Sequence, residues 1–234
     1  MDKVKMGIIG FGCRSYGMTD LLLGFDDVEI VAVCDKYEDR ADSAFNKAKE
    51  KRGFTPFKTT NYKELLALDN VDAVLISTDW ELHIPFAIEA MNAGKAVALE
   101  VGGAYSVQEC YDLVDTWERT RVPFMFMENC CFDKTETTVE NRVKDGLFGE
   151  LVYCSGAYGH DLREEVTNGT ANRHYRERNY MERCCENYPT HELGPIVRIL
   201  EIGRGNRMVR LTAMSSKAAG LSAYVKEHKA DDAD

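Results

Sequence analysis

The chain has 234 residues, of which 44% are hydrophobic and 29% are charged, and its formal net charge is −10. This mixture excludes a disordered chain and allows one large core or two modest domains. The acidic balance argues against a nucleic-acid partner, because nucleic-acid binders usually carry a basic stripe. The sequence opens on a short apolar run without a signal-peptide pattern and has no window of the roughly 20 apolar residues that span a bilayer, so we expect a cytoplasmic protein with no membrane partner.

Eight cysteines include two adjacent pairs, Cys130-Cys131 and Cys184-Cys185, but no C-x-x-C motif and no zinc-ligand spacing. In a chain without a secretion signal, such cysteines are typically reduced and partly buried. We therefore expect free thiols and no metal site.

Apolar runs alternate with helical periodicity through the first half of the chain. The strand-like runs are residues 4–10, 28–35, 71–77, 95–100 and 122–128, and the intervening helices end near residue 24 or cover residues 38–51, 80–92 and 107–121. Near-continuous apolar strands separated by helices are typical of a parallel sheet covered on both faces. The pattern predicts an α/β fold, a doubly wound Rossmann domain over residues 1–127.

The pattern changes in the second half, residues 128–234. A helix is expected over residues 135–145 and another from about residue 191, with strands within residues 151–164 and 207–216. Two strands and two helices cannot cover a sheet. We therefore expect a partial α+β domain for substrate binding or oligomerisation.

A glycine-rich loop follows the first strand and opens the first helix. It fits the dinucleotide-binding pattern G-x-G-x-x-G/A, with a small serine in the third place. An acid at the end of the second strand accepts ribose hydroxyls and repels a 2′-phosphate, which favours NAD over NADP. The expected cofactor-binding residues here are Gly10, Phe11, Gly12, Cys13, Arg14, Ser15 and Asp35. The alternatives are a tight turn without a nucleotide, a solvated Asp35, and an Arg14 paired with a surface acid.

The stretch STDWELHIPFAIEAMNAGKAVALEV, residues 77–101, resembles the Gfo/Idh/MocA oxidoreductases, and the resemblance extends over nearly all of the chain. It implies that further residues contact or flank the cofactor. These are Ser77, Thr78, His83, Glu100 and Asn129. Most members continue after this glutamate with Lys-Pro, where the lysine helps to place and protonate the substrate hydroxyl, whereas this chain has Val101 and Gly102.

A branch of the family that lacks the lysine consists of NAD-dependent glycosidases similar to α-N-acetylgalactosaminidase. The runs MENC (127–130), GLFGELVYCSGAYGHDLRE (146–164), NYPTHELGPI (187–196), GRGNR (203–207) and AMSSKAAGL (213–221) match it. Carried over by these matches, the resemblance implies three catalytic residues, Tyr158, Tyr188 and His191, and two substrate-binding residues, His160 and Arg176.

The chemistry implied by the resemblance is transient oxidation of a sugar at C3, elimination of the aglycone, addition of water and re-reduction, with the same NAD throughout. We assign His191 to proton transfer at the C3 hydroxyl, Tyr158 to the C2 proton and Tyr188 to orienting the sugar. Paired carboxylates are not needed. The structural alternatives are a His191 that caps a helix and a Tyr158 that faces inward from a strand.

Two other functions stay open: a plain NAD-dependent sugar or cyclitol dehydrogenase, and a non-catalytic nucleotide-binding module. Departures from the branch at Phe132, Tyr175, Glu192 and Asn206 leave the sugar undefined. The resemblance also stops where the family's C-terminal domain should continue with further strands. We therefore expect a fragment or a degenerate copy, from a protein that forms a homo-oligomer and binds a small sugar or glycoside.

Overall fold

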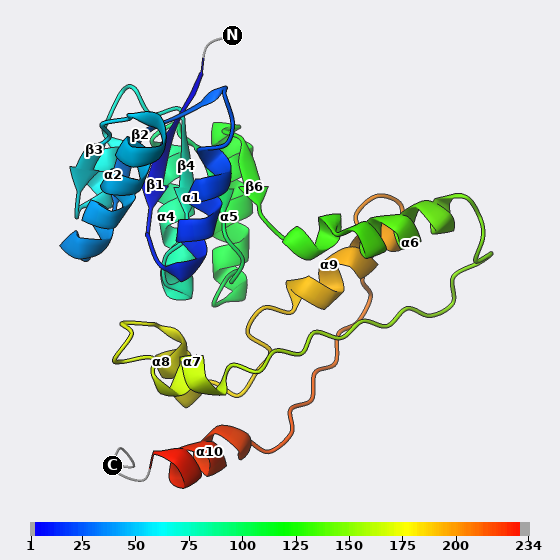
Figure 1. Cartoon of the computed structure of the whole chain (residues 1–234). Coiled ribbons are helices and arrows are strands. Elements are labelled where there is room, and N and C mark those ends of the chain that lie inside the picture. The colour runs from blue at the N-terminus through cyan, green and yellow to red at the C-terminus, as the bar shows by residue number, and fades with distance from the viewer. Residues whose placement is uncertain (1–2, 230–234) are drawn as a thin grey trace. The chain divides into compact units, whose positions relative to one another are not determined.

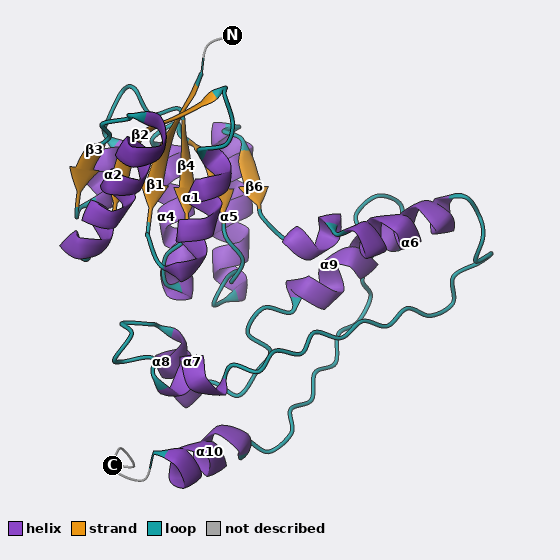
Figure 2. Ribbon diagram, viewed as in Figure 1, coloured by secondary structure: helices purple, strands orange, loops and turns teal. Residues whose placement is uncertain are grey.

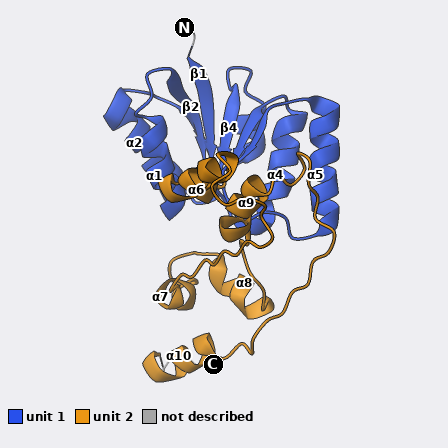
Figure 3. Cartoon of the chain, turned by 90° about the vertical axis from the view of Figure 1, so that its right-hand side faces the viewer, with its two compact units in different colours: residues 1–127 blue, residues 128–234 orange. Residues whose placement is uncertain are grey.

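The computed structural model describes residues 3–229, and the chain folds into two compact units (Figure 1). The first comprises Met1–Met127 and the second Glu128–Asp234 (Figure 3).

A six-stranded parallel sheet forms the centre of the first unit (Figure 2). Its order is β3-β2-β1-β4-β5-β6. The strands are β1 Val4–Ile9, β2 Val28–Cys34, β3 Phe57–Thr59, β4 Ala73–Ile76, β5 Ala96–Leu99 and β6 Phe124–Phe126. The chain passes from β1 outwards through β2 to β3 and then returns to β4 on the other side of β1, which is the doubly wound topology that the sequence predicts.

Helices follow the strands and bury both faces of the sheet. They are α1 Cys13–Leu22, α2 Glu38–Arg52, α3 Tyr62–Leu66, α4 Trp80–Asn92 and α5 Val107–Thr120. Neighbouring residues of one strand enter different cores: Val74 packs in one apolar cluster and Leu75 in the other. Alternation between two buried faces explains why these strands read as continuous apolar runs.

The sequence patterns missed β3 and α3. The strand has three residues and the helix five, too few to display a period of 2 or 3.6. The local signal is the Asn61 side chain, which accepts a hydrogen bond from the Lys63 amide and caps the helix.

Short helices make up the second unit. They are the 3₁₀ helix η1 Asn129–Phe132 and the α-helices α6 Lys134–Lys144, α7 Arg163–Thr167, α8 Arg176–Glu182, α9 Thr190–Ile199 and α10 Gly220–His228. Helix α9 packs against η1 and α6. Arg198 holds this group together, because its guanidinium donates to the Cys131 carbonyl at 2.6 Å and pairs with Glu140 at 2.7 Å.

The strands expected within residues 151–164 and 207–216 are not formed. Among residues 128–229 the structure has only an isolated bridge between Ile202 and Asn206. Val152 is 91% exposed and Val209 is 87% exposed, so each segment leaves a strongly apolar side chain in solvent. The segments are extended but have no neighbouring strand to pair with their backbone groups, and a strand needs such a ladder.

Across residues 3–229, no helix has both the length and the apolar composition required to cross a membrane.

Candidate functional site

Four of the predicted cofactor residues meet at the carboxyl edge of the sheet. Gly10, Asp35, Ser77 and Glu100 directly follow β1, β2, β4 and β5. Ladder hydrogen bonds fix two of them, from the Gly10 amide to the Cys34 carbonyl (2.8 Å) and from the Ser77 amide to the Ile9 carbonyl (3.0 Å). The strand order of the sheet reverses between β1 and β4. Open α/β sheets bind ligands at the carboxyl edge, next to such a switch point.

The two loop glycines have different roles. Gly10 has a φ of +88°, and a Cβ there would lie 2.4 Å from the Ser77 carbonyl oxygen, so the turn itself requires glycine. A Cβ at Gly12 would meet no atom within 4 Å. Gly12 is also the N-cap of α1, where no side chain accepts from the first turn. An uncapped helix N-terminus beside open space fits a pyrophosphate.

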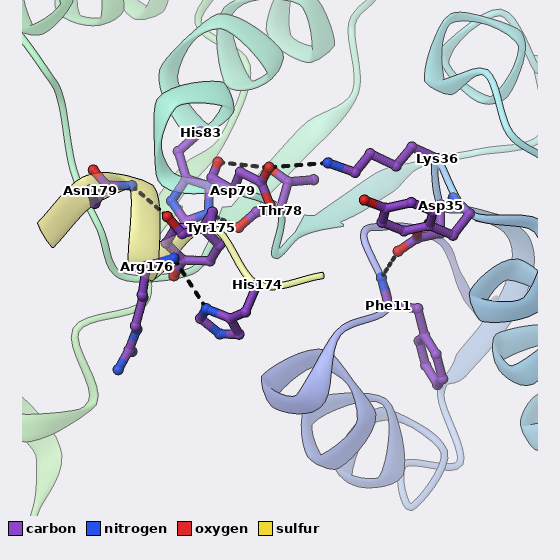
Figure 4. Close-up of polar contacts among 11 residues, drawn as sticks. Phe11, Asp35, Lys36, Thr78, Asp79, His83, His174, Tyr175, Arg176 and Asn179 are labelled. Carbon is purple, nitrogen blue, oxygen red and sulfur yellow. Dashed lines mark hydrogen bonds and ion pairs between the residues drawn. The ribbon is translucent and has the colours of Figure 1, made fainter. Parts of the chain in front are cut away.

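Asp35 ties the glycine loop to the second strand. The carboxylate is buried and accepts hydrogen bonds from the amides of Phe11 (2.7 Å) and Tyr37 (2.9 Å) (Figure 4). A carboxylate has about four lone-pair positions, so two remain for ribose hydroxyls. The next residue, Lys36, forms an ion pair with Asp79 at 3.2 Å. These contacts fit the adenosine side of a dinucleotide.

The remaining residues of the loop contribute in different ways. Ser15, in the first turn of α1, is fully buried, as expected for the small third residue of the motif. Phe11 is also buried, whereas Cys13 is exposed. Arg14 pairs with another predicted cofactor residue rather than with a surface acid: its Nε lies 2.9 Å from Oε1 of Glu100, whose side chain is 12% exposed.

His83 lies inside the first unit, 1% exposed, with Nε2 at 3.2 Å from the Thr78 carbonyl oxygen (Figure 4). Burial lowers the pKa of His83 to about 4, against the opposing effect of the Thr78 hydrogen bond. The imidazole is therefore neutral at pH 7 and supports the Thr78 segment from within the core.

Where most members of the family have Lys-Pro, this chain has Val101-Gly102, and the structure leaves no room for a larger side chain at position 102. Gly102 has a φ of +146°, and a Cβ there would lie 2.0 Å from Cδ1 of Trp80. Val101 is buried. The indole of Trp80, which begins α4, thus occupies the space that a side chain at position 102 would need. No residue pattern in the sequence indicates this contact.

In the second unit, all three predicted catalytic side chains come together. The ring centroids of Tyr158 and His191 are 4.6 Å apart, those of Tyr188 and His191 are 5.1 Å apart, and those of the two tyrosines are 5.5 Å apart. All three pairs are edge-to-face. We call Tyr158, Tyr188 and His191 the aromatic cluster.

Tyr158 reaches the aromatic cluster from an extended segment rather than from a strand. A Cβ at Gly156 would lie 3.2 Å from Glu192 and from Ile196 of α9. The missing side chain therefore lets the segment approach α9 two residues before Tyr158. His191 belongs to the first turn of α9.

The two tyrosines have different environments. Tyr188 is buried, and burial raises its pKa to about 12, so its hydroxyl stays protonated and can donate a hydrogen bond. Tyr158 is 38% exposed, and its hydroxyl lies 3.4 Å from Nδ1 of His160. Of the two, Tyr158 is better placed to exchange a proton.

The two predicted substrate-binding residues both adjoin the aromatic cluster. His160 contacts Tyr158, as described above, and the Arg176 guanidinium lies 5.5 Å from the ring centroid of Tyr188. Arg176 also contacts Glu165 at 3.1 Å. Asn129 is exposed at the start of η1.

Glu128 is the functional candidate that the sequence analysis missed. It is buried, and its Oε1 lies 2.7 Å from Nδ1 of His191. The same carboxylate accepts from the Thr190 hydroxyl (2.6 Å) and from the Cys130 amide (3.0 Å). An acid at the end of a predicted strand was the available signal, but its partner is 63 residues away in the sequence.

The ligand atoms of Glu128, Cys130 and His191 lie within 4.8 Å of one another, a grouping that could hold a metal ion. The sequence predicts no metal, and the hydrogen bond between Glu128 and His191 already engages two of these three groups. Burial raises the pKa of the Cys130 thiol to about 11.

Comparison with known families divides the chain close to the boundary between its units. Residues 4–127 match the model of the Gfo/Idh/MocA oxidoreductase family, described as an NAD-binding Rossmann fold. Residues 132–234 match the C-terminal domain of glycosyl hydrolase 109. The cofactor of the first unit is NAD, as the glycine loop and Asp35 predict.

Curated relatives cover the chain almost completely. An alpha-N-acetylgalactosaminidase from Shewanella oneidensis is 40% identical over 233 residues, covering 97% of this chain and 50% of that protein. A glycosyl hydrolase family 109 protein from Saccharopolyspora erythraea is 38% identical over 232 residues, with the same coverage. The chain thus spans about half the length of the curated relatives it matches.

Solved structures share the fold at low identity. A myo-inositol 2-dehydrogenase from Lactobacillus plantarum superposes with a TM-score of 0.69 and 21% identity, covering 85% of this chain and 56% of that one. A 3-ketoreductase from Actinomadura kijaniata, in complex with NADP, gives a TM-score of 0.54 at 23% identity over 64% of this chain and 46% of that one. On the family match and the sheet topology, the chain belongs to the Gfo/Idh/MocA oxidoreductase family.

Proposed function

We propose that the protein is an NAD-dependent glycosidase that cleaves a glycoside by transient oxidation of its sugar. The observation that carries this proposal is the aromatic cluster, which brings two hydroxyls and one imidazole together in the second unit. A redox-neutral elimination needs such proton-transfer groups and does not need two carboxylates flanking the glycosidic bond. The absence of the family's lysine at Val101 supports the same choice.

Gly10, Gly12 and Asp35 would hold the dinucleotide, which would supply a hydride acceptor and donor for C3 of the sugar. His191 accepts the proton of the C3 hydroxyl as that carbon is oxidised to a ketone. The ketone acidifies the C2 proton, which the phenolate oxygen of Tyr158 removes. The electron pair of the C2–H bond forms a C1–C2 double bond, and the aglycone leaves C1 with the electrons of the C1–O bond.

Addition of water then places a hydroxyl on C1 and a proton from Tyr158 on C2. Return of the hydride to C3 and of the His191 proton to its oxygen would restore the alcohol, so that no net oxidation results. Tyr188, which stays protonated at neutral pH, donates a hydrogen bond that orients the sugar. The relative from Shewanella oneidensis suggests an α-N-acetylgalactosaminide as the substrate class.

The test is a panel of nitrophenyl α- and β-glycosides and free sugars, incubated with the chain and NAD⁺ in D₂O. We expect nitrophenol release without accumulation of NADH, and deuterium at C2 of the released sugar. Nitrophenol without deuterium at C2 would contradict elimination. NADH accumulation with a free sugar would indicate a plain dehydrogenase. NAD binding with neither product would favour a non-catalytic module.

A variant pair assigns the chemistry to the aromatic cluster. His191→Gln should abolish nitrophenol release and leave NAD affinity unchanged, because the glycine loop and its hydrogen bond to Asp35 stay intact. The matched control is His228→Gln, which changes an exposed histidine of α10. Full activity in His191→Gln would overturn the catalytic assignment.

A further inference from the structure

We propose that Glu128 is a positioning residue for His191: its carboxylate holds the imidazole as the Nδ1–H tautomer and leaves Nε2 as the basic nitrogen. The part of this inference that concerns catalysis rests on the proposed function. The part that concerns the tautomer rests on the hydrogen bonds of the second unit alone.

Three hydrogen bonds define the state of the carboxylate. The Thr190 hydroxyl donates to Oε2, and the Cys130 amide donates to Oε1. Nδ1 of His191 lies 2.7 Å from the same Oε1. A carboxylate that accepts at both oxygens has no proton to give. The hydrogen between Glu128 and His191 therefore belongs to Nδ1, and the lone pair of the imidazole is on Nε2.

The backbone is shaped to bring the two groups together. Gly194 lies one turn after Thr190 in α9, and a Cβ there would meet the Cys131 sulfur at 2.7 Å and Cγ of Glu128 at 3.1 Å. Glycine inside a helix costs about 1 kcal/mol relative to alanine, so a close contact is the usual reason to keep it. Here the missing side chain lets α9 approach Glu128.

The surroundings also restrict rotation of the ring. The imidazole of His191 is 13% exposed and is flanked edge-to-face by Tyr158 and Tyr188. Reversing the ring would place a carbon where Nδ1 meets Glu128 and would leave a buried carboxylate oxygen with one donor fewer. Glu128 thus selects both the tautomer and the orientation in which Nε2 is available to a substrate hydroxyl.

Side-chain ¹⁵N NMR of the full 234-residue chain tests the tautomer directly. The chain has five histidines, and His191→Asn identifies the signals of His191 by their loss. We expect a pyrrole-type signal for Nδ1 and a pyridine-type signal for Nε2 in the wild type. A protonated Nε2 in the neutral imidazole would overturn the proposal.

Two variants at position 128 separate the hydrogen bond from the charge. Glu128→Gln should keep the Nδ1–H tautomer, because the Cys130 amide still requires an oxygen at the Oε1 position. Glu128→Met, of similar length, removes the acceptor and should release the ring to the Nε2–H form. An unchanged tautomer in Glu128→Met would overturn the proposal.

Activity provides the second readout. We expect kcat to fall in the order wild type, Glu128→Gln, Glu128→Met, with a loss on the order of 10²- to 10⁴-fold in the last, as in other sites where a histidine loses its orienting carboxylate. The control is Glu140→Gln, which changes a buried carboxylate of the same unit that pairs with Lys144 and Arg198. If Glu140→Gln lowered kcat as much as Glu128→Met, the effect would be structural and the positioning role would be wrong. If the wild type cleaved no glycoside, the proposed function would fail while the tautomer experiment still decided the hydrogen-bond assignment.

Discussion

Acidification should destabilise the first unit through one side chain, His83. Burial lowers its pKa from 6.5 to about 4, and it is the only histidine in residues 1–127. At pH values between these two pKa values, His83 binds a proton in the unfolded chain but not in the native state. The free energy of unfolding therefore falls as the pH decreases, by up to about 1.4 kcal/mol per pH unit.

The magnitude follows from the same two pKa values. Over the whole interval the loss approaches about 3 kcal/mol, and about 2 kcal/mol of it appears between about pH 7.5 and pH 5. His83 is 1% exposed, so solvent screens little of this contribution. Asp20 acts in a different window: its ion pairs with Lys47 and Lys51 lower its pKa below 3.8, so its contribution is lost at more acidic pH.

Urea unfolding followed by tryptophan fluorescence isolates this unit, since both tryptophans, Trp80 and Trp117, belong to it. His83→Gln keeps a donor for the Thr78 carbonyl and should abolish most of the pH dependence of the free energy of unfolding above about pH 5. The exposed His228→Gln should retain it. The assignment to His83 would be refuted if the wild type had the same free energy of unfolding at about pH 7.5 and about pH 5. It would also be refuted if His83→Gln kept the wild-type slope of this free energy against pH.

Two further predictions concern glycines of the first unit. Gly10→Ala should lower the free energy of unfolding of the unit by at least about 2 kcal/mol, because of its positive φ and the clash with Ser77. Gly12→Ala should leave the free energy of unfolding unchanged and weaken NAD binding at least about 10-fold in a titration. Equal NAD affinity in Gly12→Ala would contradict the pyrophosphate site. Gly102→Ala should cost about 3 kcal/mol and shift the emission of Trp80 to longer wavelength, and an unchanged spectrum would contradict the close contact between them.

The first unit could be predicted because its signals are local. β2 reads as a continuous apolar run because the helices cover both faces of the sheet, and α4 begins and ends at the predicted residues. The glycine loop and Asp35 fit a known spacing, and the structure joins them by the hydrogen bond from the Phe11 amide. In each case the interacting residues lie within one motif or one strand-helix repeat.

The site in the second unit could not be predicted from periodicity. Tyr158 and His191 were selected by resemblance, since nothing in their local sequences shows that the rings meet. Glu128 was missed because its partners Thr190 and His191 are more than sixty positions away, and a hydrogen bond of that range has no sequence spacing. The signal lies instead in Gly194, a helical glycine whose missing Cβ faces Glu128.

The expected strand around Tyr158 failed for a related reason. Alternating apolar residues predict a strand only if a neighbour pairs with its backbone, and no such neighbour lies along residues 151–164. Tyr158 is instead located by the approach of Gly156 to α9, the same helix that carries His191. The aromatic cluster therefore depends on one helix and two close glycine contacts, at Gly156 and Gly194, rather than on a sheet register. A change that moved α9 would displace Tyr158, His191 and the hydrogen bond to Glu128 together.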